Sequence, residues 1–390
     1  MNLPYLETAG MIGARLCRDA LWHQGRCNWT SDVLDGETLA HGALGPDLYD
    51  GSSGIALFLW RLAEATGERI FRVTAQAAIR QALDRLPIAG CGLYSGGLGV
   101  LYAAAEVTRA FDREAVLKQA LPDREKLDVI DGSAGAIAAL LNLRLVEAAV
   151  PHGDLLLSEA CRGDEGWSWK TIPAACNLTG FSHGASGIAW ALLELHNATG
   201  EPRFCHAALE AFRYERHFFN PTEQNWPDFR DRPTSFPVYW CHGAAGIALA
   251  RLRAWQILKD ESLLAEARIA LDKVAGATHS LSNFSLCHGQ SGNADALIYA
   301  SQILQEERWL RDAEKIAQAG LDQFEQRRIP WPCGVPGANE TPDLMLGLAG
   351  IGYFYLRLAE PAQTPPVTLL SIAPVRPEFS QDVHSHVVSE

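Results

Sequence analysis

The sequence lacks a long hydrophobic run, since no apolar stretch reaches the roughly 18–20 residues of a membrane-spanning helix. Its start lacks the basic residues and apolar core of a signal peptide. Basic residues are also few: 33 Lys and Arg stand against 46 Asp and Glu, giving a formal net charge of −13, and they form no local patch. We therefore expect a cytoplasmic protein with no membrane span and no nucleic-acid partner.

Cysteine is sparse as well, with nine in 390 residues. An odd and low number argues against a disulfide scaffold and leaves metal-binding, catalytic or buried thiols. Seven of the nine have no second thiol or histidine placed like a ligand pair, so we expect them to be structural and mostly small core residues. These seven are Cys17, Cys27, Cys91, Cys161, Cys176, Cys205 and Cys333.

The sequence does contain a repeat. A G-x-x-G motif followed by an apolar, helix-like run occurs seven times, with starts 36 to 59 residues apart. We call each motif, with the three residues before it, a glycine corner and number the corners in chain order. Their first glycines are Gly51, Gly96, Gly132, Gly184, Gly243, Gly289 and Gly347. No Gly-Lys pair occurs, which excludes a Walker phosphate loop.

The runs after the corners are apolar on most faces, which is typical of helices buried nearly all round. Amphipathic helical stretches lie between them and belong on the outside. Examples are 69–86, 201–217, 262–275 and 310–327. Each repeat is therefore read as an outer helix, a loop, a glycine corner and an inner helix, so seven repeats predict about fourteen helices and little strand.

Seven hairpins can form an open solenoid or a closed ring. The terminal repeats of a solenoid should be polar, yet the first and seventh here are among the most apolar. The sequence therefore predicts an all-α fold, a closed double-layered α/α toroid over residues 1–372, followed by a mobile tail at 373–390. We expect a long proline-rich loop at 219–239 and an extended piece at 367–372.

The chemistry lies before the corner glycines. His183, His242 and His288 occupy equivalent positions in three successive corners, and Cys241 and Cys287 precede two of them. Equivalent corners of a ring surround one mouth, so these groups can converge. Two Cys and one His would make an open zinc site, and two Cys and two His a closed one. Spacing alone does not choose, nor does it exclude cysteines that pack under the corners.

The corner motifs resemble those of the lanthionine synthetase C-like family, the zinc cyclases of lanthipeptide biosynthesis, from about Ala14 to Ile372. RCNW and NWPDFR are most similar to the C-terminal cyclase domain of class II synthetases, whose preceding dehydratase domain we expect to be absent here. The motifs are LYDGSSGIALFL, DVIDGSAG, GFSHGASGIAWALLEL, NWPDFR, WCHGAAGIALARL, LCHGQSGN and DLMLGLAGIGY.

The resemblance implies a seven-fold toroid with one zinc ion held by Cys241, Cys287 and His288. The implied reaction adds a cysteine thiol of a dehydrated precursor peptide to dehydroalanine or dehydrobutyrine, forming a lanthionine or methyllanthionine thioether. A dehydratase domain or protein is a further implied partner. Zinc chemistry agrees, because a thiol bound to Zn²⁺ loses its proton.

His183 is the predicted catalytic acid, since the enolate carbon must be protonated and imidazole titrates near neutral pH. Asp128 occupies the family's catalytic position, where it would orient His183 or help take the thiol proton; a buried hydrogen-bonding role is the alternative. Asp131 is expected to cap a helix. His242 either supports the ligands or is structural.

The tryptophans and the 225–230 loop allow two interpretations. Trp226, Asp228, Arg230 and Trp240 could contact a peptide, but packing is the favoured reading. Other functions are a family relative that adds glutathione to dehydrated residues, a noncatalytic peptide-binding toroid, and, most weakly, a toroidal glycosidase, which needs an acid pair that is not evident beside the thiols.

Overall fold

The structure is a computed structural model that describes residues 3–35, 38–230, 233–277 and 282–370. Within these ranges it contains fourteen α-helices, seven of which follow the glycine corners. These inner helices are α2 (Ser52–Thr66), α4 (Gly97–Thr108), α6 (Ser133–Asn142), α8 (Ala185–Thr199), α10 (Ala244–Leu258), α12 (Gln290–Leu304) and α14 (Leu348–Ala359).

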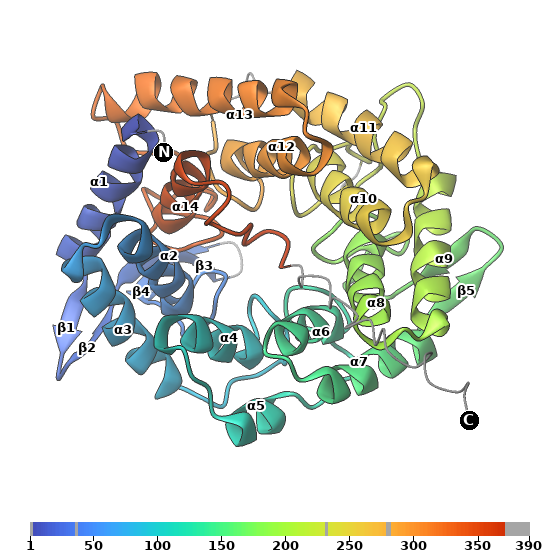
Figure 1. Cartoon of the computed structure of the whole chain (residues 1–390), viewed down its shortest axis with the longest axis horizontal. Coiled ribbons are helices and arrows are strands. Elements are labelled where there is room, and N and C mark those ends of the chain that lie inside the picture. Colours follow the sequence, from blue (N-terminus) through green and yellow to red (C-terminus); the bar gives the residue numbers. More distant parts are fainter. Residues whose placement is uncertain (1–2, 36–37, 231–232, 278–281, 371–390) are drawn as a thin grey trace, which may run out of the picture.

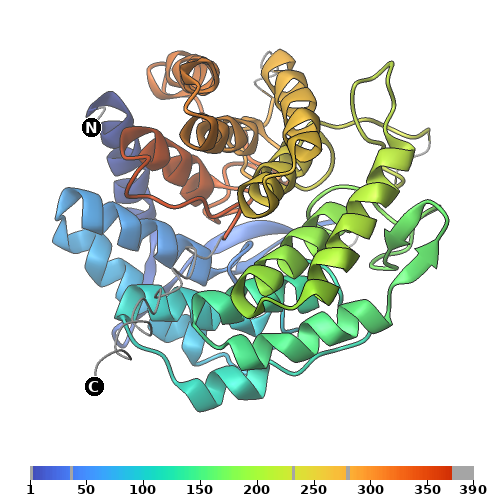
Figure 2. The same cartoon turned by 45° about the vertical axis from the view of Figure 1, so that its right-hand side comes forward.

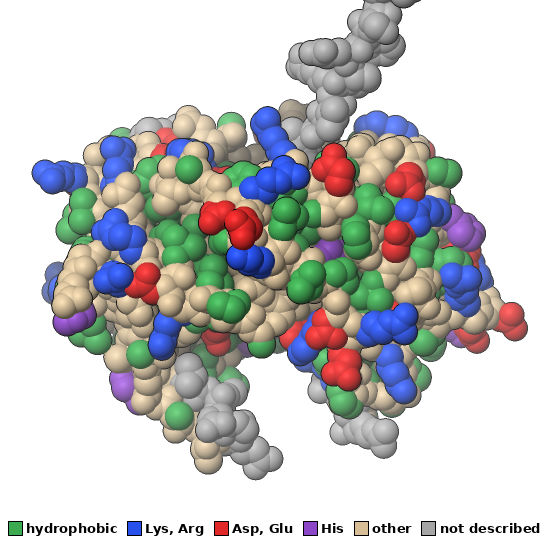
Figure 3. Space-filling view, turned by 90° about the horizontal axis from the view of Figure 1, so that it is seen from below, with side chains coloured by type: hydrophobic (Ala, Val, Ile, Leu, Met, Phe, Trp, Pro, Cys, Tyr) green, Lys and Arg blue, Asp and Glu red, His purple; other side chains and the backbone are tan. Residues whose placement is uncertain are grey.

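The other seven helices form an outer layer (Figures 1 and 2). They are α1 (Leu3–Asp19), α3 (Arg69–Leu83), α5 (Arg113–Gln119), α7 (Val146–Ser158), α9 (Pro202–Phe218), α11 (Glu261–Gly276) and α13 (Glu307–Gly320), which continues into a π-helical turn, η1 (Leu321–Glu325). On the outer wall seen in Figure 3, acidic and basic side chains are interspersed.

The ring is closed. Each inner helix packs against the next inner helix, and the seventh, α14, packs against the first, α2. The outer helix of α14 is α1, so the first and last described helices of the chain meet. The predicted double-layered α/α toroid is confirmed. No helix among the described residues is both long and apolar enough to cross a membrane.

The pairing of layers differs from the predicted order. Six of the seven described inner helices pack most closely on the outer helix that follows them around the ring, and only α4 packs more closely on α3, the outer helix before its corner. The reason is local: the first and fourth inner helices end at Gly67 and Gly200, whose left-handed backbones (φ 75° for both) turn the chain back at once. The longer connections run from an outer helix to the next corner.

Strand content is low, as predicted. The described strands form three antiparallel hairpins. These are β1 (Leu21–His23) with β2 (Arg26–Asn28), β3 (Thr30–Asp35) with β4 (Thr38–Ala43), and β5 (Cys161–Gly163) with β6 (Gly166–Ser168). The predicted 219–239 loop is largely irregular, with isolated bridges such as Asp228 to Ser235.

The two glycines of a corner have different roles. The first is the N-cap of the inner helix, and the second lies in its first turn, beneath the carbonyl six residues earlier. A Cβ at Gly99 would lie 1.7 Å from the Leu93 carbonyl oxygen, and one at Gly292 would lie 1.9 Å from that of Leu286. Only glycine therefore allows the corner to fold back on its helix.

A closed circle of backbone hydrogen bonds joins the seven corners. Each corner donates an N–H to a carbonyl of the next, over 2.9–3.2 Å. The bonds run from Leu48 to Tyr94, Tyr94 to Ile130, Val129 to Ser182, Ser182 to Cys241, Cys241 to Cys287, Cys287 to Met345, and Met345 to Tyr49. The corners therefore form one connected rim at one mouth of the ring.

After α14 the chain turns into the centre of the ring (Figure 1). Val367, Thr368 and Leu369 are buried there. The Tyr94 hydroxyl donates to the Val367 carbonyl and the Trp240 indole to the Thr368 carbonyl, both at 2.8 Å. The predicted extended piece is thus described as far as residue 370, and the predicted tail at 373–390 lies outside the described residues.

The cysteine prediction is confirmed in part. Cys17, Cys27 and Cys91 are buried, and Cys205 and Cys333 are partly buried. Cys161 and Cys176 are exposed, so the expectation of core positions is wrong for these two. Cys161 lies in the β5–β6 hairpin, outside the helical layers.

Candidate metal centre

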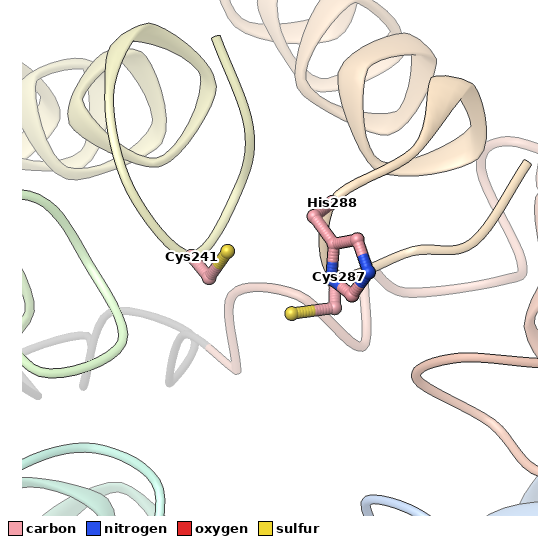
Figure 4. Close-up of side chains that lie close together, drawn as sticks. All are labelled: Cys241, Cys287 and His288. Atoms are coloured by element: carbon pink, nitrogen blue, oxygen red, sulfur yellow. The ribbon is translucent and has the colours of Figure 1, made fainter. Parts of the chain in front are cut away.

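Three of the five candidate ligands come together at the rim. Cys241 precedes α10, and Cys287 and His288 precede α12 (Figure 4). One ligand atom from each lies within 4.8 Å of the other two. Both cysteines are buried and His288 is partly buried. The predicted convergence of these three side chains is therefore observed.

The backbone of the rim fixes the two thiols side by side. The Cys241 N–H donates to the Cys287 carbonyl at 3.2 Å, and the Cys287 N–H donates to Met345 at 2.9 Å. The fifth corner is bent further by Gly243, whose φ of 94° favours glycine. Any Cβ there would lie 1.7 Å from the Pro237 carbonyl oxygen.

The hydrogen bonding of His288 sets its tautomer. Its Nε2 lies 2.9 Å from the Gly334 carbonyl oxygen, which can only accept, so Nε2 carries the proton. In the neutral ring Nδ1 therefore carries the lone pair. A histidine that ligates a metal through one nitrogen while donating from the other is the usual arrangement in metalloproteins.

The two thiols share their protons unequally. A hydrogen bond from Cys287, supported by His288, holds the pKa of Cys241 well below its usual value in spite of burial. Burial, followed by the neighbouring Cys241, raises the pKa of Cys287 well above its usual value. The pair therefore favours one thiolate next to one thiol.

This donor set fits zinc. Tetrahedral zinc with bonds of about 2.3 Å to sulfur places two sulfurs about 3.8 Å apart, and the three ligand atoms here already lie within 4.8 Å of one another. Two sulfurs and one imidazole nitrogen are ligands that zinc prefers, and three protein ligands leave a fourth position open.

Sequence reasoning missed Tyr49 of the first corner. Its hydroxyl donates to the Cys287 sulfur at 2.9 Å, although the two residues are 238 positions apart in the sequence. The signal was present, because Tyr49 stands two residues before Gly51 in an aligned corner. Its side-chain direction could not be read from that alignment.

His183 and Asp128 form a second group. His183 Nδ1 lies 2.5 Å from Asp128 Oδ2, and their side chains are 25% and 5% exposed. The other Asp128 oxygen accepts the N–H groups of Ile130 and Asp131 at 3.0 and 3.1 Å. The Asp128 carboxylate is thus held in place by the backbone of the residues that follow it. Because Nδ1 of His183 faces this carboxylate, Nε2 is the nitrogen that remains available for another partner.

The two groups lie on neighbouring corners. The Ser182 N–H donates to the Cys241 carbonyl at 3.0 Å, so the residues that follow, His183 and His242, are also neighbours. Their rings stack with centroids 5.8 Å apart. The rim thus places a histidine–carboxylate pair beside the thiol cluster.

His242 is buried and stays outside the ligand cluster. Its Nε2 lies 3.2 Å from the Ser182 hydroxyl, and its Nδ1 lies 3.9 Å from Oδ2 of Asp228. Burial lowers the pKa of His242 to about 4, against the pull of Cys241. The ring is therefore neutral near pH 7.

The other residues considered in the sequence analysis are either buried in packing contacts or form ion pairs near the surface. Trp226 and Trp240 are buried, in agreement with the packing interpretation. Asp228 is buried and binds the partly exposed Arg230 through two oxygens. The predicted cap at Asp131 is wrong: Gly132 is the N-cap of α6, and Asp131 pairs instead with Lys126 at 2.5 Å.

Comparison with known proteins gives one family. The model for "Lanthionine synthetase C-like protein" matches residues 42–370. The lacticin 481/lactococcin biosynthesis protein LcnDR2 of Lactococcus lactis subsp. lactis is 24% identical over 260 residues, which are 62% of this chain and 27% of that protein. The match thus spans about a quarter of that relative's length.

Solved structures share the fold. A nisin cyclase superposes with a TM-score of 0.66 at 16% identity, covering 83% of this chain and 91% of the cyclase. An α-1,6-mannanase of Salegentibacter sp. HEL1_6 has a TM-score of 0.51 at 12% identity, covering 91% and 99% of the two chains. At such identities these likenesses show the toroid alone.

Proposed function

Because the chain belongs to the lanthionine synthetase C-like family, we propose that it is a zinc-dependent lanthipeptide cyclase. It adds a cysteine thiol of a peptide to dehydroalanine or dehydrobutyrine in the same peptide and so forms lanthionine or methyllanthionine rings. The observation that carries the proposal is the cluster of Cys241, Cys287 and His288 beside the His183–Asp128 pair.

Cys241, Cys287 and His288 would hold one zinc ion per chain. Bound there, zinc would lower the pKa of an incoming thiol so that it reacts as a thiolate at neutral pH. Two thiolates and a neutral imidazole offset the two positive charges of the ion. The sulfur of the substrate therefore keeps more electron density than it would opposite three histidines.

His183 supplies the proton that completes the addition. The new carbon–sulfur bond forms at the β-carbon of the alkene, whose electron pair moves to give an enolate. The α-carbon then takes a proton from His183 Nε2, and the proton lost by the thiol restores the histidine through solvent. Asp128 keeps Nδ1 protonated and the ring oriented, because it accepts at 2.5 Å.

The substrate is a precursor peptide that contains both cysteine and dehydrated serine or threonine. A dehydratase, as a domain or a separate protein, must act first, because the alkene is its product. The similarity to a lacticin 481/lactococcin biosynthesis protein and to a nisin cyclase supports this partner class. We place the cyclase domain at residues 1–372 and the protein in the cytoplasm, where the ligand thiols stay reduced.

The test is metal content together with turnover. Wild-type protein, Cys287→Ala and His183→Gln are purified identically without chelator and analysed by elemental mass spectrometry. We expect one zinc per chain in the wild type and in His183→Gln, and loss of zinc in Cys287→Ala. With a dehydrated, cysteine-containing peptide, His183→Gln should form thioether about 100 to 10,000 times more slowly.

The outcomes separate the candidate functions. A folded, reduced wild type that binds no zinc would contradict the cyclase and favour a peptide-binding toroid. Zinc-dependent addition of glutathione without peptide ring closure would keep the chemistry and change the substrate. Wild-type turnover in zinc-loaded His183→Gln would remove the acid role of His183.

A further inference from the structure

Tyr49 touches the thiol cluster from outside the proposed ligand set. It lies in the first corner, whereas the ligands lie in the fifth and sixth, and its hydroxyl donates to the Cys287 sulfur at 2.9 Å. The Tyr49 hydroxyl therefore contacts the sulfur of one proposed ligand but is not itself a proposed metal ligand. It is also distinct from the His183–Asp128 pair, which lies on the third and fourth corners.

The rim holds the Tyr49 backbone on both sides. Its N–H donates to the Tyr94 carbonyl and to Asp47 Oδ1, each at 2.9 Å, and its carbonyl accepts from the Met345 N–H at 2.9 Å. The seventh corner, which carries Met345, also accepts the Cys287 N–H through the same residue. Tyr49 and Cys287 are therefore fixed to one common point.

The ring of Tyr49 is fixed too. It meets Tyr94 edge to face, with centroids 6.4 Å apart and planes at 90°. Tyr94 in turn packs against Trp240 at 5.1 Å, and both donate to the C-terminal segment in the centre of the ring. A phenol supported in this way loses little conformational entropy when it binds a sulfur.

We propose that Tyr49 is a positioning residue of the metal centre: its hydroxyl holds Cys287 in the ligating rotamer and donates a hydrogen bond to that sulfur when metal is bound. The proposal rests on the metal site proposed above. A phenol is a neutral donor at neutral pH and stabilises a thiolate without displacing the metal. Hydrogen bonds to ligand sulfurs are a known means of tuning metal centres.

The direction of the effect follows from charge. A hydrogen bond withdraws electron density from the Cys287 thiolate, so this sulfur gives less charge to the metal. A metal held there would then attract the electrons of an incoming thiol more strongly and lower the pKa of that thiol further. Loss of the hydroxyl should therefore weaken metal binding, because the Cys287 side chain is no longer held in its ligating rotamer. It should also leave the Cys287 sulfur more electron-rich.

The experiment compares Tyr49→Phe with Tyr94→Phe. Both remove a hydroxyl from neighbouring rings of the same aromatic cluster, but the Tyr94 hydroxyl binds a carbonyl and not a thiol. Zinc affinity is measured by competition with a chromophoric chelator. We expect Tyr49→Phe to bind zinc about 10 to 100 times more weakly, and Tyr94→Phe to bind within about threefold of wild type.

Cobalt(II) in place of zinc gives a readout independent of turnover. The sulfur-to-cobalt charge-transfer band should move to longer wavelength in Tyr49→Phe, because the sulfur electrons are held less tightly, and should stay in place in Tyr94→Phe. Site-specific 3-fluorotyrosine at position 49 is a stronger donor of nearly the same shape. It should move the band to shorter wavelength.

Three outcomes would contradict the proposed role of Tyr49. Unchanged affinity and an unchanged cobalt spectrum in Tyr49→Phe would overturn the proposal while leaving the metal site intact. A wild type that binds neither metal would remove the proposed function and this inference together. Equal losses in both phenylalanine variants, with no opposite shift in the fluorinated protein, would reduce Tyr49 to a packing residue.

Discussion

His152 is a buried histidine with no part in the proposed chemistry. It lies on α7, where its ring nitrogens contact the Ser133 hydroxyl at 3.1 Å and the Ala120 carbonyl at 3.2 Å. The carbonyl fixes the proton on Nε2, and the hydroxyl donates to Nδ1. Burial lowers the pKa of His152 to about 4.

This shift makes the fold sensitive to acid. Between pH 6.5 and about 4 the unfolded chain binds a proton at His152 that the folded chain refuses, so stability rises with pH in this window and is lost as the pH falls. We predict that His152→Gln removes this dependence. Relative to the variant, the metal-free wild type should lose about 2 kcal/mol of unfolding free energy from pH 7 to pH 5.

Urea unfolding at both pH values measures this difference. His41→Gln is the matched control, because the His41 side chain is 63% exposed. An equal loss in wild type and His152→Gln would show that acid acts elsewhere in the protein.

At the residue scale, the sequence predicted the contacts that repeat symmetry creates. Aligned corners indicated that Cys241, Cys287, His288, His183 and His242 could converge, and the family resemblance implied which three of them would hold a metal. Tyr49 was missed, since a corner alignment locates a backbone position but not the direction of a side chain that crosses the ring. The exclusion of His242 also depended on rotamers and burial rather than on spacing.

At the element scale, the second corner glycine couples the helix to the ligands. We predict that Gly292→Ala lowers both stability and zinc binding, because the added Cβ would lie 1.9 Å from the Leu286 carbonyl and must displace the backbone just before Cys287. A cost of about 1–3 kcal/mol is expected for such overpacking. Thermal unfolding and metal analysis report the two effects.

Gly276→Ala is the control for this change. Gly276 ends α11, and a Cβ there meets nothing within 4 Å. Alanine should be neutral or stabilise slightly, as it does in helices. A Gly292→Ala protein as stable and as rich in zinc as this control would contradict the steric role of the corner.

Helix positions were predicted well and their details less so. The expected outer helix at 201–217 is found as α9, Pro202–Phe218, because its amphipathic period is unbroken. The expected helix at 310–327 instead ends its α-helical part at Gly320 and continues as a π-helical turn. A Cβ at Gly320 would lie 2.7 Å from the Tyr355 hydroxyl, a tertiary contact that periodicity does not contain.

At the scale of the whole molecule, the segment 364–370 fills the centre of the ring. Beyond the bonds to Val367 and Thr368, the buried Asp295 accepts from the Thr368 hydroxyl and pairs with Arg357 at 2.5 Å. We predict that a chain ending at residue 363 loses cooperative unfolding, because it uncovers apolar surface and leaves buried polar groups without partners.

A chain ending at Leu370 is the matched control, since it keeps every contact described for this segment. Calorimetry of the two chains measures the difference. If the shorter chain unfolds with the same cooperativity and midpoint as the control, the segment is not part of the structural core.

The closure of the ring could be predicted from the sequence, whereas the position of the segment 364–370 in its centre could not. The apolar first and seventh repeats indicated that neither end faces solvent, and this is what the contact of α14 with α2 provides. The sequence predicted an extended piece at 367–372, but nothing in the pattern of residues 364–370 indicates that they turn inward. Their place is set by tertiary hydrogen bonds to Tyr94 and Trp240.

The pairing of α1 with α14 has a consequence for synthesis on the ribosome. The apolar face of α1, including Ile12 and Leu16, is made well before its main partner helix, which begins only at Leu348. At about 5–20 residues per second, this face waits on the order of 20–70 s for its cover. During that interval α1 has only its smaller contacts with α2 and α3, so the nascent chain carries a partly uncovered hydrophobic helix that a chaperone would bind until α14 emerges.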